Sequence, residues 1–361
     1  MKKLLIIGNG SIGNSQNKEF YINNHTGNFL KEIDKKHEVL FAQNVVSHSP
    51  NNDLQNFEMK KNQISFAGLK SIKKPSTILQ LIKLVRQHNF VYLFFPGTLS
   101  RIAALLCIIF NKKFALYIRG QYYNQYKIDG IILKKSRFIL TVSPHFMDGL
   151  HTYCKNVEII KPMISIKKED IDFSRKYEKS DKWNLLFVGR IEYRKGIREL
   201  IEIAHYLKSK HLNFELNLVG GGDLFYVTQE QVKNTNLDDC IKLHGQISNK
   251  HDLMDFYSNA DVFVFTSHDE GFPRVLYEAM AFGLPIFTTF VGGIPGRMEN
   301  NRNCIEIPVK KGNNAAQIIL KTIQNTELLK AIGEEGRNTL LKILDGSYLP
   351  HEDLFLKNIE K

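Results

Sequence analysis

The sequence is poor in the residues that build disulfide scaffolds and metal knuckles. Its 361 residues include four cysteines and one tryptophan. The cysteines have no close spacing, which argues against a disulfide framework, a zinc knuckle or a CxxC redox pair. They are Cys107, Cys154, Cys240 and Cys304, and we expect them to be buried free thiols in a reducing compartment. No DxD-like acidic pair stands where metal binding is convincing, so no metal site is predicted.

Long apolar runs are also missing. The run Leu4–Ile7 ends at Gly8, whereas the apolar region of a signal peptide needs at least about seven residues. The longest later stretch, Ile102–Phe110, is far shorter than the roughly 18–20 residues that span a bilayer. The sequence therefore predicts a cytoplasmic protein without a membrane-spanning segment, and leaves open peripheral contact with the inner face of the cell membrane.

Charge is distributed unevenly along the chain. The formal net charge is +12. Residues 1–165 hold 23 Lys and Arg against 9 Asp and Glu, while the remainder holds 26 against 28. A basic half favours an anionic partner, such as a phospholipid leaflet or a diphosphate-linked substrate. A solvated lysine-rich surface is an equally simple interpretation.

Short apolar, β-branched runs alternate with helical patterns through the whole chain, which indicates parallel α/β layers. The length suits two domain cores, and a lysine-rich and acid-rich segment of weak periodicity lies between them. We therefore predict an α/β protein with two Rossmann-like, parallel-sheet domains. The predicted parts are an N-terminal domain (1–165), a linker (166–182), a C-terminal domain (183–345) and a final helix (346–361) that returns to the first domain.

The most informative stretch is residues 261–278, which reads as a strand, a tight loop and a helix. Pro273 suits the first helical turn. Glu270 then stands on the loop before the helix and Glu278 within its first two turns. Acceptor-only carboxylates suit the hydroxyls of a sugar or ribose. The backbone amides at the helix start favour a phosphate; they belong to Gly271, Phe272 and Arg274.

Two glutamates in this setting, separated by seven residues, resemble the signature of retaining glycosyltransferases of the large family 4 (glycosyl transferases group 1), which have the GT-B fold. The resemblance implies two Rossmann-like domains that face an interdomain cleft. It also implies that Glu270 contacts the donor sugar and Glu278 the ribose of the nucleotide. The alternative is a helix start with acidic residues that compensate the helix dipole.

A second segment, Leu186–Gly196, resembles the part of these enzymes that binds the donor diphosphate. Arg190 can bridge phosphate oxygens through its planar fork, and Lys195 can act as a point charge. Arg194 is a third base that competes for the same role. The alternative is a group of surface bases after a strand.

Two glycine loops lie between these segments at predicted strand ends, where ligands bind in open α/β sheets. By resemblance, the loop with Gly245 and Gln246 flanks the nucleobase, and Gly221 belongs to the loop before it. Gly296 stands where many family members carry glutamate, which leaves the contacts there open.

Residues 8–13 satisfy the GxGxxG pattern of dinucleotide-binding proteins. That fingerprint requires the glycines to open a helix, whereas a polar loop follows here, so a nicotinamide enzyme is disfavoured. The glycosyltransferase interpretation places Gly10 and Gly27 on loops that face the cleft and its acceptor, although Gly27 also fits a helix start. Arg119 stands where many family members carry a histidine, and can stabilise an oxyanion or bind a phosphorylated acceptor.

The helical pattern Thr77–His88 combines apolar positions with Lys83 and Arg86. It can form an amphipathic surface for an anionic membrane. Packing of its apolar side against the sheet is the alternative, and the pattern fits both.

Together these features predict transfer of a sugar, with retention, from a nucleoside-diphosphate donor to a hydroxyl of a glycan or lipid-linked acceptor, in bacterial surface-polysaccharide assembly. Glu270, Arg190 and Lys195 would act at the reaction centre. The nucleotide sugar is the substrate, and no other cofactor is expected. The alternatives are a nucleotide-sugar epimerase of the same fold and a basic nucleic-acid-binding protein. No recognition helix, RNP-like strand or zinc spacing supports the latter, so no nucleic-acid partner is predicted.

Overall fold

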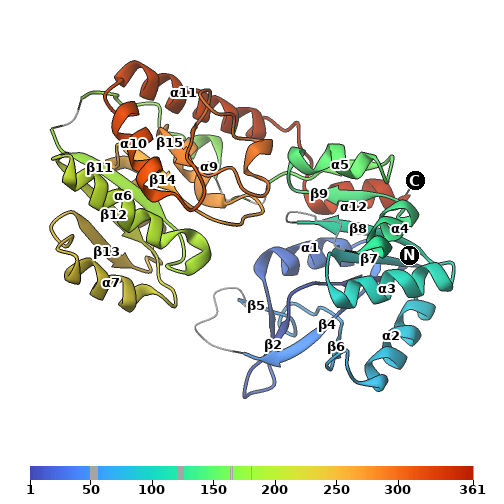
Figure 1. The fold of residues 1–361 in the computed structure, drawn as a ribbon. Coiled ribbons are helices and arrows are strands. Elements are labelled where there is room, and N and C mark those ends of the chain that lie inside the picture. The colour runs from blue at the N-terminus through green and yellow to red at the C-terminus, as the bar shows by residue number, and fades with distance from the viewer. Residues whose placement is uncertain (49–55, 120–125, 163, 165, 180, 361) are drawn as a thin grey trace. The chain divides into compact units, whose positions relative to one another are not determined.

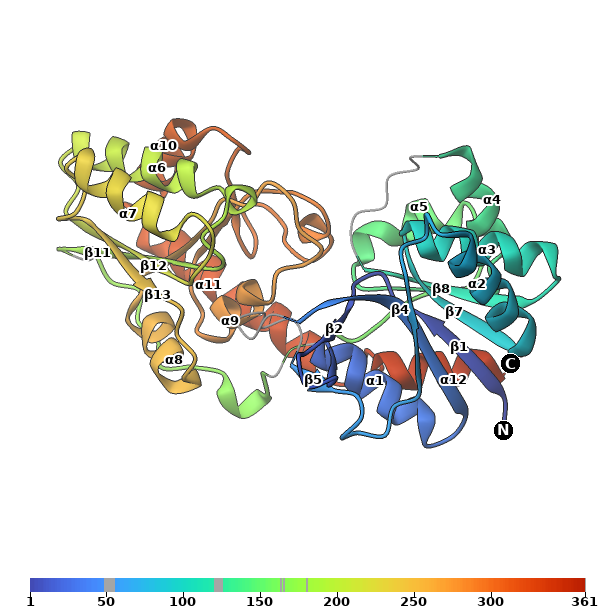
Figure 2. The same cartoon turned by 90° about the horizontal axis from the view of Figure 1, so that it is seen from below.

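The computed structural model describes residues 1–48, 56–119, 126–162, 164, 166–179 and 181–360. The chain forms two compact units, Met1–Met163 with Leu349–Lys361, and Ile164–Tyr348. Each unit is built on a largely parallel sheet with helices on both faces (Figures 1 and 2). The α/β prediction is confirmed.

The first unit is organised around parallel strands in the order β10-β9-β8-β7-β1-β4. Beyond β4 the sheet continues through shorter strands, of which β3 pairs antiparallel with β2 and β5. The central strands are β1 (Lys3–Ile7), β4 (Glu38–Ser47), β7 (Phe90–Phe95), β8 (Lys113–Ile118), β9 (Ile139–Thr141) and β10 (Val157–Ile159). The short strands are β2 (Ile12–Asn14), β3 (Phe20–Ile22), β5 (Phe57–Glu58) and β6 (Phe66–Leu69).

Two cores sandwich this sheet because alternate side chains of a strand point to opposite faces. Leu4 and Ile6 of β1 belong to one core, and Leu5 and Ile7 to the other. The first core is covered by α1 (Asn24–Asp34) and α12 (His351–Glu360). The second is covered by α2 (Pro75–Gln87), α3 (Thr98–Ile109), α4 (Lys127–Lys135) and α5 (Met147–His151).

Helix α2 corresponds to the predicted amphipathic helix. Leu81, Leu84 and Val85 are buried in the core beneath it, whereas Leu79 is 67% exposed. Most of its apolar side therefore packs on the sheet. Among the described helices, none has both the length and the apolar character needed to cross a membrane.

The final helix α12 belongs to the first unit. The ring of Phe355 lies 4.6 Å from that of Tyr92, centroid to centroid, and is fully buried. His351 stacks on Phe29 and its Nε2 lies 2.7 Å from the hydroxyl oxygen of Tyr92. The C-terminal segment thus completes the core that α1 covers.

The second unit has a parallel sheet in the order β13-β12-β11-β14-β15-β16. Its strands are β11 (Trp183–Val188), β12 (Phe214–Val219), β13 (Ile241–Gly245), β14 (Val262–Phe265), β15 (Ile286–Thr288) and β16 (Ile305–Glu306). Its helices are α6 (Ile197–Ser209), α7 (Phe225–Asn234), α8 (Lys250–Asn259), α9 (Arg274–Ala281), α10 (Gly312–Thr322) and α11 (Thr326–Leu344). One continuous apolar core holds the sheet and these helices together.

The segment 166–182, predicted as a linker, is part of this second unit. The guanidinium of Arg175 donates to the carbonyl oxygens of Ala260, at 2.7 Å, and Tyr257, at 2.8 Å. The hydroxyl of Tyr177 donates to the carbonyl oxygen of Gly283 at 2.7 Å. The segment thus binds carbonyl groups at the ends of α8 and α9, which explains why a charged stretch of weak periodicity is held in place. The unit boundaries accordingly fall after Met163 and Tyr348 instead of at the predicted positions.

Candidate functional site

Two residues predicted at the reaction centre contact each other in the second unit. Lys195 ends the 3₁₀ helix η3 (Tyr193–Lys195), and its ammonium group forms an ion pair with the carboxylate of Glu270. The side chains are 19% and 11% exposed. Ser267 adds a hydrogen bond, because its hydroxyl donates to the same carboxylate oxygen at 2.9 Å. A cation and an acceptor are thus brought together at the carboxyl ends of two neighbouring strands, β11 and β14.

Backbone contacts fix the two loops that carry this pair. The hydroxyl of Thr266 donates to the carbonyl oxygens of Lys195, at 3.1 Å, and Gly196, at 3.0 Å. The amide of His268 donates to the carbonyl oxygen of Arg194 at 2.8 Å. Gly292 packs from the other side: its φ is 58°, and a Cβ atom there would lie 1.7 Å from the carbonyl oxygen of Glu270. Only glycine fits this contact.

The other two predicted bases are far more exposed. Arg190 is 60% exposed and its guanidinium lies 2.5 Å from the carboxylate of Glu192. Arg194 is 69% exposed and faces Asp269 at 3.6 Å. Arg194 therefore does not replace Lys195 at Glu270.

Glu278 lies on α9, as predicted, and its carboxylate accepts a hydrogen bond of 2.6 Å from the hydroxyl of Tyr257. Burial and the neighbouring Glu278 raise the pKa of Tyr257 well above its ordinary value, so the phenol stays a donor. A pocket of about 330 Å³ opens beside the two residues. Its other walls come from the loop and helix after β13, including Ile247, Asn249 and Leu253.

Tyr257 was not identified from the sequence. Its phenol has no sequence neighbour with which it forms a recognisable motif, and it reaches Glu278 only because α8 and α9 pack together in one core. An aromatic residue on the buried side of a helix is indistinguishable from ordinary core until its partner is placed.

The start of α9 differs slightly from the prediction. Pro273 is the N-cap residue, and the first helical residue is Arg274. Gly271 and Phe272 precede it on the loop, where the carbonyl oxygen of Gly271 accepts a hydrogen bond from the amide of Gly293 at 2.8 Å. The first turn contains no acidic residue. Because the Glu270 carboxylate contacts Lys195, it does not cap this helix.

The glycine loops after β12 and β13 are joined to the loop after β11. The amide of Gly220 donates to the carbonyl oxygen of Gly245, and the amide of Ile191 to that of Gly221, each at 2.8 Å. A Cβ atom on Gly221 would lie 3.5 Å from the Cβ of Gln246. The loops after β12 and β13 thus lie beside the segment that carries Arg190, at the carboxyl ends of the strands. They contain Gly221, Gly245 and Gln246.

The three residues predicted to face the cleft from the first unit do not lie in one place. Gly10 and Arg119 line one pocket of about 360 Å³. Gly27 was expected on a loop, but it lies inside α1, where an added Cβ would be 2.2 Å from the ring of Phe57. The helix begins earlier because the side chain of Asn23 caps it by accepting from the amide of His25 at 3.0 Å. Gly27 therefore serves to let the helix pack closely against Phe57.

The GxGxxG segment continues into strand β2, Ile12–Asn14, instead of opening a helix. The backbone amides of a helix N-terminus, which the dinucleotide fingerprint places at the pyrophosphate, are therefore not supplied at this position.

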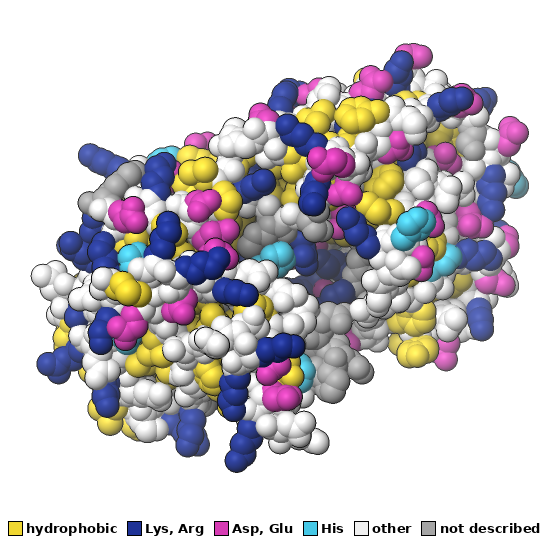
Figure 3. Space-filling view, turned by 180° about the vertical axis from the view of Figure 1, so that it is seen from behind, with side chains coloured by type: hydrophobic (Ala, Val, Ile, Leu, Met, Phe, Trp, Pro, Cys, Tyr) yellow, Lys and Arg dark blue, Asp and Glu magenta, His cyan; other side chains and the backbone are white. Residues whose placement is uncertain are grey.

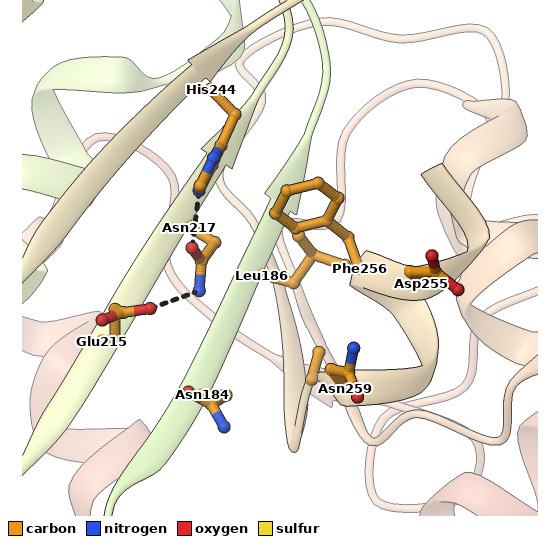
Figure 4. A pocket seen from close by; sticks show the side chains of 9 residues that line it. Asn184, Leu186, Glu215, Asn217, His244, Asp255, Phe256 and Asn259 are labelled. Atoms are coloured by element: carbon orange, nitrogen blue, oxygen red, sulfur yellow. Dashed lines mark hydrogen bonds between the residues drawn. The ribbon is translucent and has the colours of Figure 1, made fainter. Parts of the chain in front are cut away.

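A further polar pocket of about 300 Å³ lies between α8 and the sheet of the second unit (Figure 4). His244 bonds the side chain of Asn217 at 2.7 Å, and the ring of Phe256 packs against the imidazole, with 4.6 Å between centroids. None of the predicted site residues is among the described residues that line it. Elsewhere in the described ranges, three exposed residues of α8 lie close enough to share a metal ion: His251, Asp252 and Asp255.

Comparisons with known proteins match much of the second unit to one family. Residues 168–339 match the family described as "Glycosyl transferases group 1". The match covers slightly less than half of the chain, so it shows a similarity of this segment to that family. The matched segment contains the Lys195–Glu270 pair, Glu278 and the glycine loops, so all the donor-site residues predicted from the sequence fall within it.

The curated relatives match only part of their length. The capsular polysaccharide biosynthesis glycosyltransferase CapM of Staphylococcus aureus is 31% identical over 181 residues, which are 48% of this chain and 47% of that protein. The amylovoran biosynthesis glycosyltransferase AmsK of Erwinia amylovora is 32% identical over 146 residues, 39% and 36% of the two chains. The chain thus spans about half or less of the length of these two relatives.

Solved structures extend the similarity to the whole chain. A glycosyltransferase from Rickettsia africae covers 99% of this chain and 97% of its own, with a TM-score of 0.68 and 20% identity. Anabaena HepE, solved in complex with UDP, covers 100% of both chains with a TM-score of 0.67 and 13% identity. The fold outside the matched segment is therefore also that of these structures, and the GT-B prediction is confirmed.

Proposed function

We propose that the protein is a retaining glycosyltransferase that moves a sugar from a nucleoside diphosphate to a hydroxyl of a glycan or lipid-linked acceptor. The observation that carries the proposal is the partly buried ion pair between Lys195 and Glu270. The loop after β11, which carries Lys195, is also hydrogen-bonded to the glycine loop after β12. A cation beside a sugar-binding carboxylate is what the departing diphosphate of such a donor requires.

The donor would enter between these groups. Lys195 would turn from Glu270 toward the diphosphate, and Glu270 would then be free to accept hydrogen bonds from the sugar hydroxyls. A charge-assisted hydrogen bond contributes about 1.5–3 kcal/mol net. Arg190 is exposed and its guanidinium pairs with Glu192 at the surface, so it can supply a second cation.

Negative charge develops on the diphosphate as its bond to the anomeric carbon breaks, and Lys195, Arg190 and the amides before Arg274 would stabilise that charge. The acceptor oxygen forms the new bond to the anomeric carbon on the face that the diphosphate leaves. Its proton passes to a phosphate oxygen of the leaving group. This scheme needs no protein nucleophile and no metal ion.

The nucleoside would occupy the pocket beside Glu278. The carboxylate can accept from ribose hydroxyls while the phenol of Tyr257 holds it in place. The apolar wall formed by Ile247 and Leu253 suits the face of a base. HepE has been solved with UDP, so uridine diphosphate is the first nucleotide to test.

The names of the relatives support a setting in surface-polysaccharide assembly, since CapM and AmsK are described as capsular polysaccharide and amylovoran enzymes. Calorimetry with uridine, guanosine and adenosine diphosphates, with EDTA present, tests the donor site. Glycan products from the matching nucleotide sugar then show by NMR whether the anomeric configuration is retained. Absence of binding by every diphosphate, or release of a free epimerised sugar without acceptor extension, would overturn the proposal.

A further inference from the structure

The pocket of the first unit that contains Gly10 and Arg119 lies at the carboxyl ends of β1, β7 and β8, beside Phe41 and Gln43 in the middle of β4. These four strands are neighbours and run parallel. In open α/β sheets this edge is where ligands bind. The pocket holds about 360 Å³, enough for a small polar molecule or the head of a larger one.

One buried polar atom in this pocket has no partner within the described part of the chain. Gln43 of β4 is 2% exposed, and its amide nitrogen donates to the carbonyl oxygen of Gly10. Its other atom, Oε1, is buried with no hydrogen-bond partner. Because Gly8 has no Cβ, the amide can stand where such an atom would lie 2.4 Å from Oε1. A buried carbonyl oxygen of this kind is an acceptor waiting for a donor.

A second feature of the pocket is a cation with no counter-ion among the described residues. Arg119 follows β8 and is exposed, and no described carboxylate lies within ion-pair distance of it. The other described lining residues are uncharged, with amide and hydroxyl groups from Asn9, Asn23 and Thr26 among them. His351 lies in the core of the same unit, and burial and the charge of Arg119 lower its pKa to about 3, so it adds no positive charge. One guanidinium among neutral donors favours an anion.

We propose that this pocket binds a phosphorylated polyol as the acceptor. Arg119 would bind the phosphate, and Gln43 Oε1 would accept a hydrogen bond from a hydroxyl group. The inference rests on the proposed function, and it narrows the acceptor to a molecule that carries a phosphate near its hydroxyls. The basic charge of the first 165 residues acts in the same direction, since it attracts such an anion from a distance. Lys and Arg side chains are numerous on the visible face of this unit (Figure 3).

The phosphate can belong to a soluble sugar or polyol phosphate, or to the headgroup of a lipid. Calorimetry on the full chain therefore uses three probes: glycerol 3-phosphate, dihexanoyl-phosphatidylglycerol below its micelle concentration, and glycerol as the uncharged match. We expect one or both phosphates to bind and glycerol to bind at least 10-fold more weakly. Preference for glycerol 3-phosphate assigns a soluble acceptor, and preference for the short lipid assigns a headgroup.

Two variants and one matched control test the residues. Arg119→Gln should weaken the phosphate probe about 10-fold or more, since it removes a charge-assisted bond. Lys113→Gln removes the same charge from the other end of β8 and should leave binding within about 2-fold. Gln43→Leu should weaken glycerol and glycerol 3-phosphate by a similar factor, because it removes the acceptor for the hydroxyl. Equal effects of Arg119→Gln and Lys113→Gln, or no binding of either phosphate, would overturn the inference.

Nucleoside-diphosphate binding by the second unit is measured on the same samples and should be unchanged in these variants. If the wild-type chain binds the phosphate probe but no nucleotide, the proposed function fails and the anion pocket stands. If it binds nucleotide but neither phosphate, the donor site stands and the acceptor class is wrong.

Discussion

Lys195 and Glu270 are 75 residues apart in the sequence, and their side chains form an ion pair at the ends of neighbouring strands. The pair is largely shielded from solvent, with exposures of 19% and 11%. Loss of one partner therefore leaves a charge with little water to stabilise it. In the proposed function, these are the two charges that would act on the diphosphate and the sugar of the donor.

Lys195→Ala and Glu270→Ala should each lower turnover by about 10²–10³-fold, the usual cost of removing one group that stabilises developing charge. Arg194→Ala is the matched control because Arg194 is the base next to Lys195. Its side chain is 69% exposed and pairs at the surface with Asp269. It should keep turnover within about 3-fold, as expected for an exposed pair. Initial rates with saturating donor measure these effects. Near-normal turnover in both alanine variants would refute the assignment.

Gly292→Ala should abolish donor binding, because its Cβ would lie 1.7 Å from the backbone oxygen of Glu270 and the loop must move. Gly346→Ala is the control variant, because it introduces backbone strain without a steric clash. Gly346 also has a positive φ, of 94°, but an added Cβ there meets nothing within 4 Å. It should cost about 1–2 kcal/mol of stability and leave nucleotide affinity intact. Equal affinities in the two variants would show that the Gly292 contact does not position Glu270.

The buried His351 should make the protein less stable in acid. Burial and the charge of Arg119 lower its pKa to about 3 in the folded chain, whereas the unfolded chain has an ordinary pKa of about 6.5. Between these values the unfolded state binds a proton that the folded state does not. The stabilisation is therefore complete above about pH 6.5 and is lost as the pH falls toward 3, by up to about 1.4 kcal/mol per pH unit for this group.

Thermal unfolding midpoints from pH 4 to 8 check this expectation. His351→Gln should flatten the acid side of the curve while lowering the midpoint at pH 7, because it removes a stacked and hydrogen-bonded ring. His251→Gln is the control, since that side chain is 84% exposed, and it should keep the wild-type curve. An unchanged acid slope in His351→Gln would contradict the assignment.

We propose that helices α2 and α4 provide contact with an anionic membrane. Leu79 is 67% exposed on α2, and Ile131 is 51% exposed on α4, beside Lys134 and Lys135. Anionic vesicles should retain the protein at low salt and release it at high salt, and vesicles of phosphatidylcholine should not retain it. Ile131→Ser with Lys134→Gln should reduce retention several-fold. Failure to bind anionic vesicles at any salt concentration would count against this surface.

The regular parts of the fold were predictable from the sequence because their signals are local. Strand β1 and the helix after Pro273 follow directly from apolar runs, glycine and proline. Short strands such as β2 and β6 were missed because three or four residues carry too little pattern. The contacts of the segment 166–182 could not be predicted, because Arg175 is held by carbonyl groups far along the chain.

The site was also predictable only in part: the sequence indicated individual residues but not the contacts between them. Spacing and resemblance pointed to Glu270 and Lys195, but not to their contact with each other. Gln43 and Tyr257 gave no signal, since each matters only through a partner that another strand or helix supplies. Gly27 was misinterpreted because its neighbour Phe57 lies 30 residues away, and sequence alone cannot show which glycines are crowded.

The position of α12 has a consequence for biosynthesis. Its residues close a core whose strands emerge from the ribosome hundreds of residues earlier, so the first unit cannot reach its final packing until this helix has been synthesised. The second unit, in contrast, is contiguous in sequence. A nascent chain that stalls before His351 would thus carry a complete second unit attached to an incomplete first unit, with the aromatic cluster around Tyr92 open to chaperones and proteases.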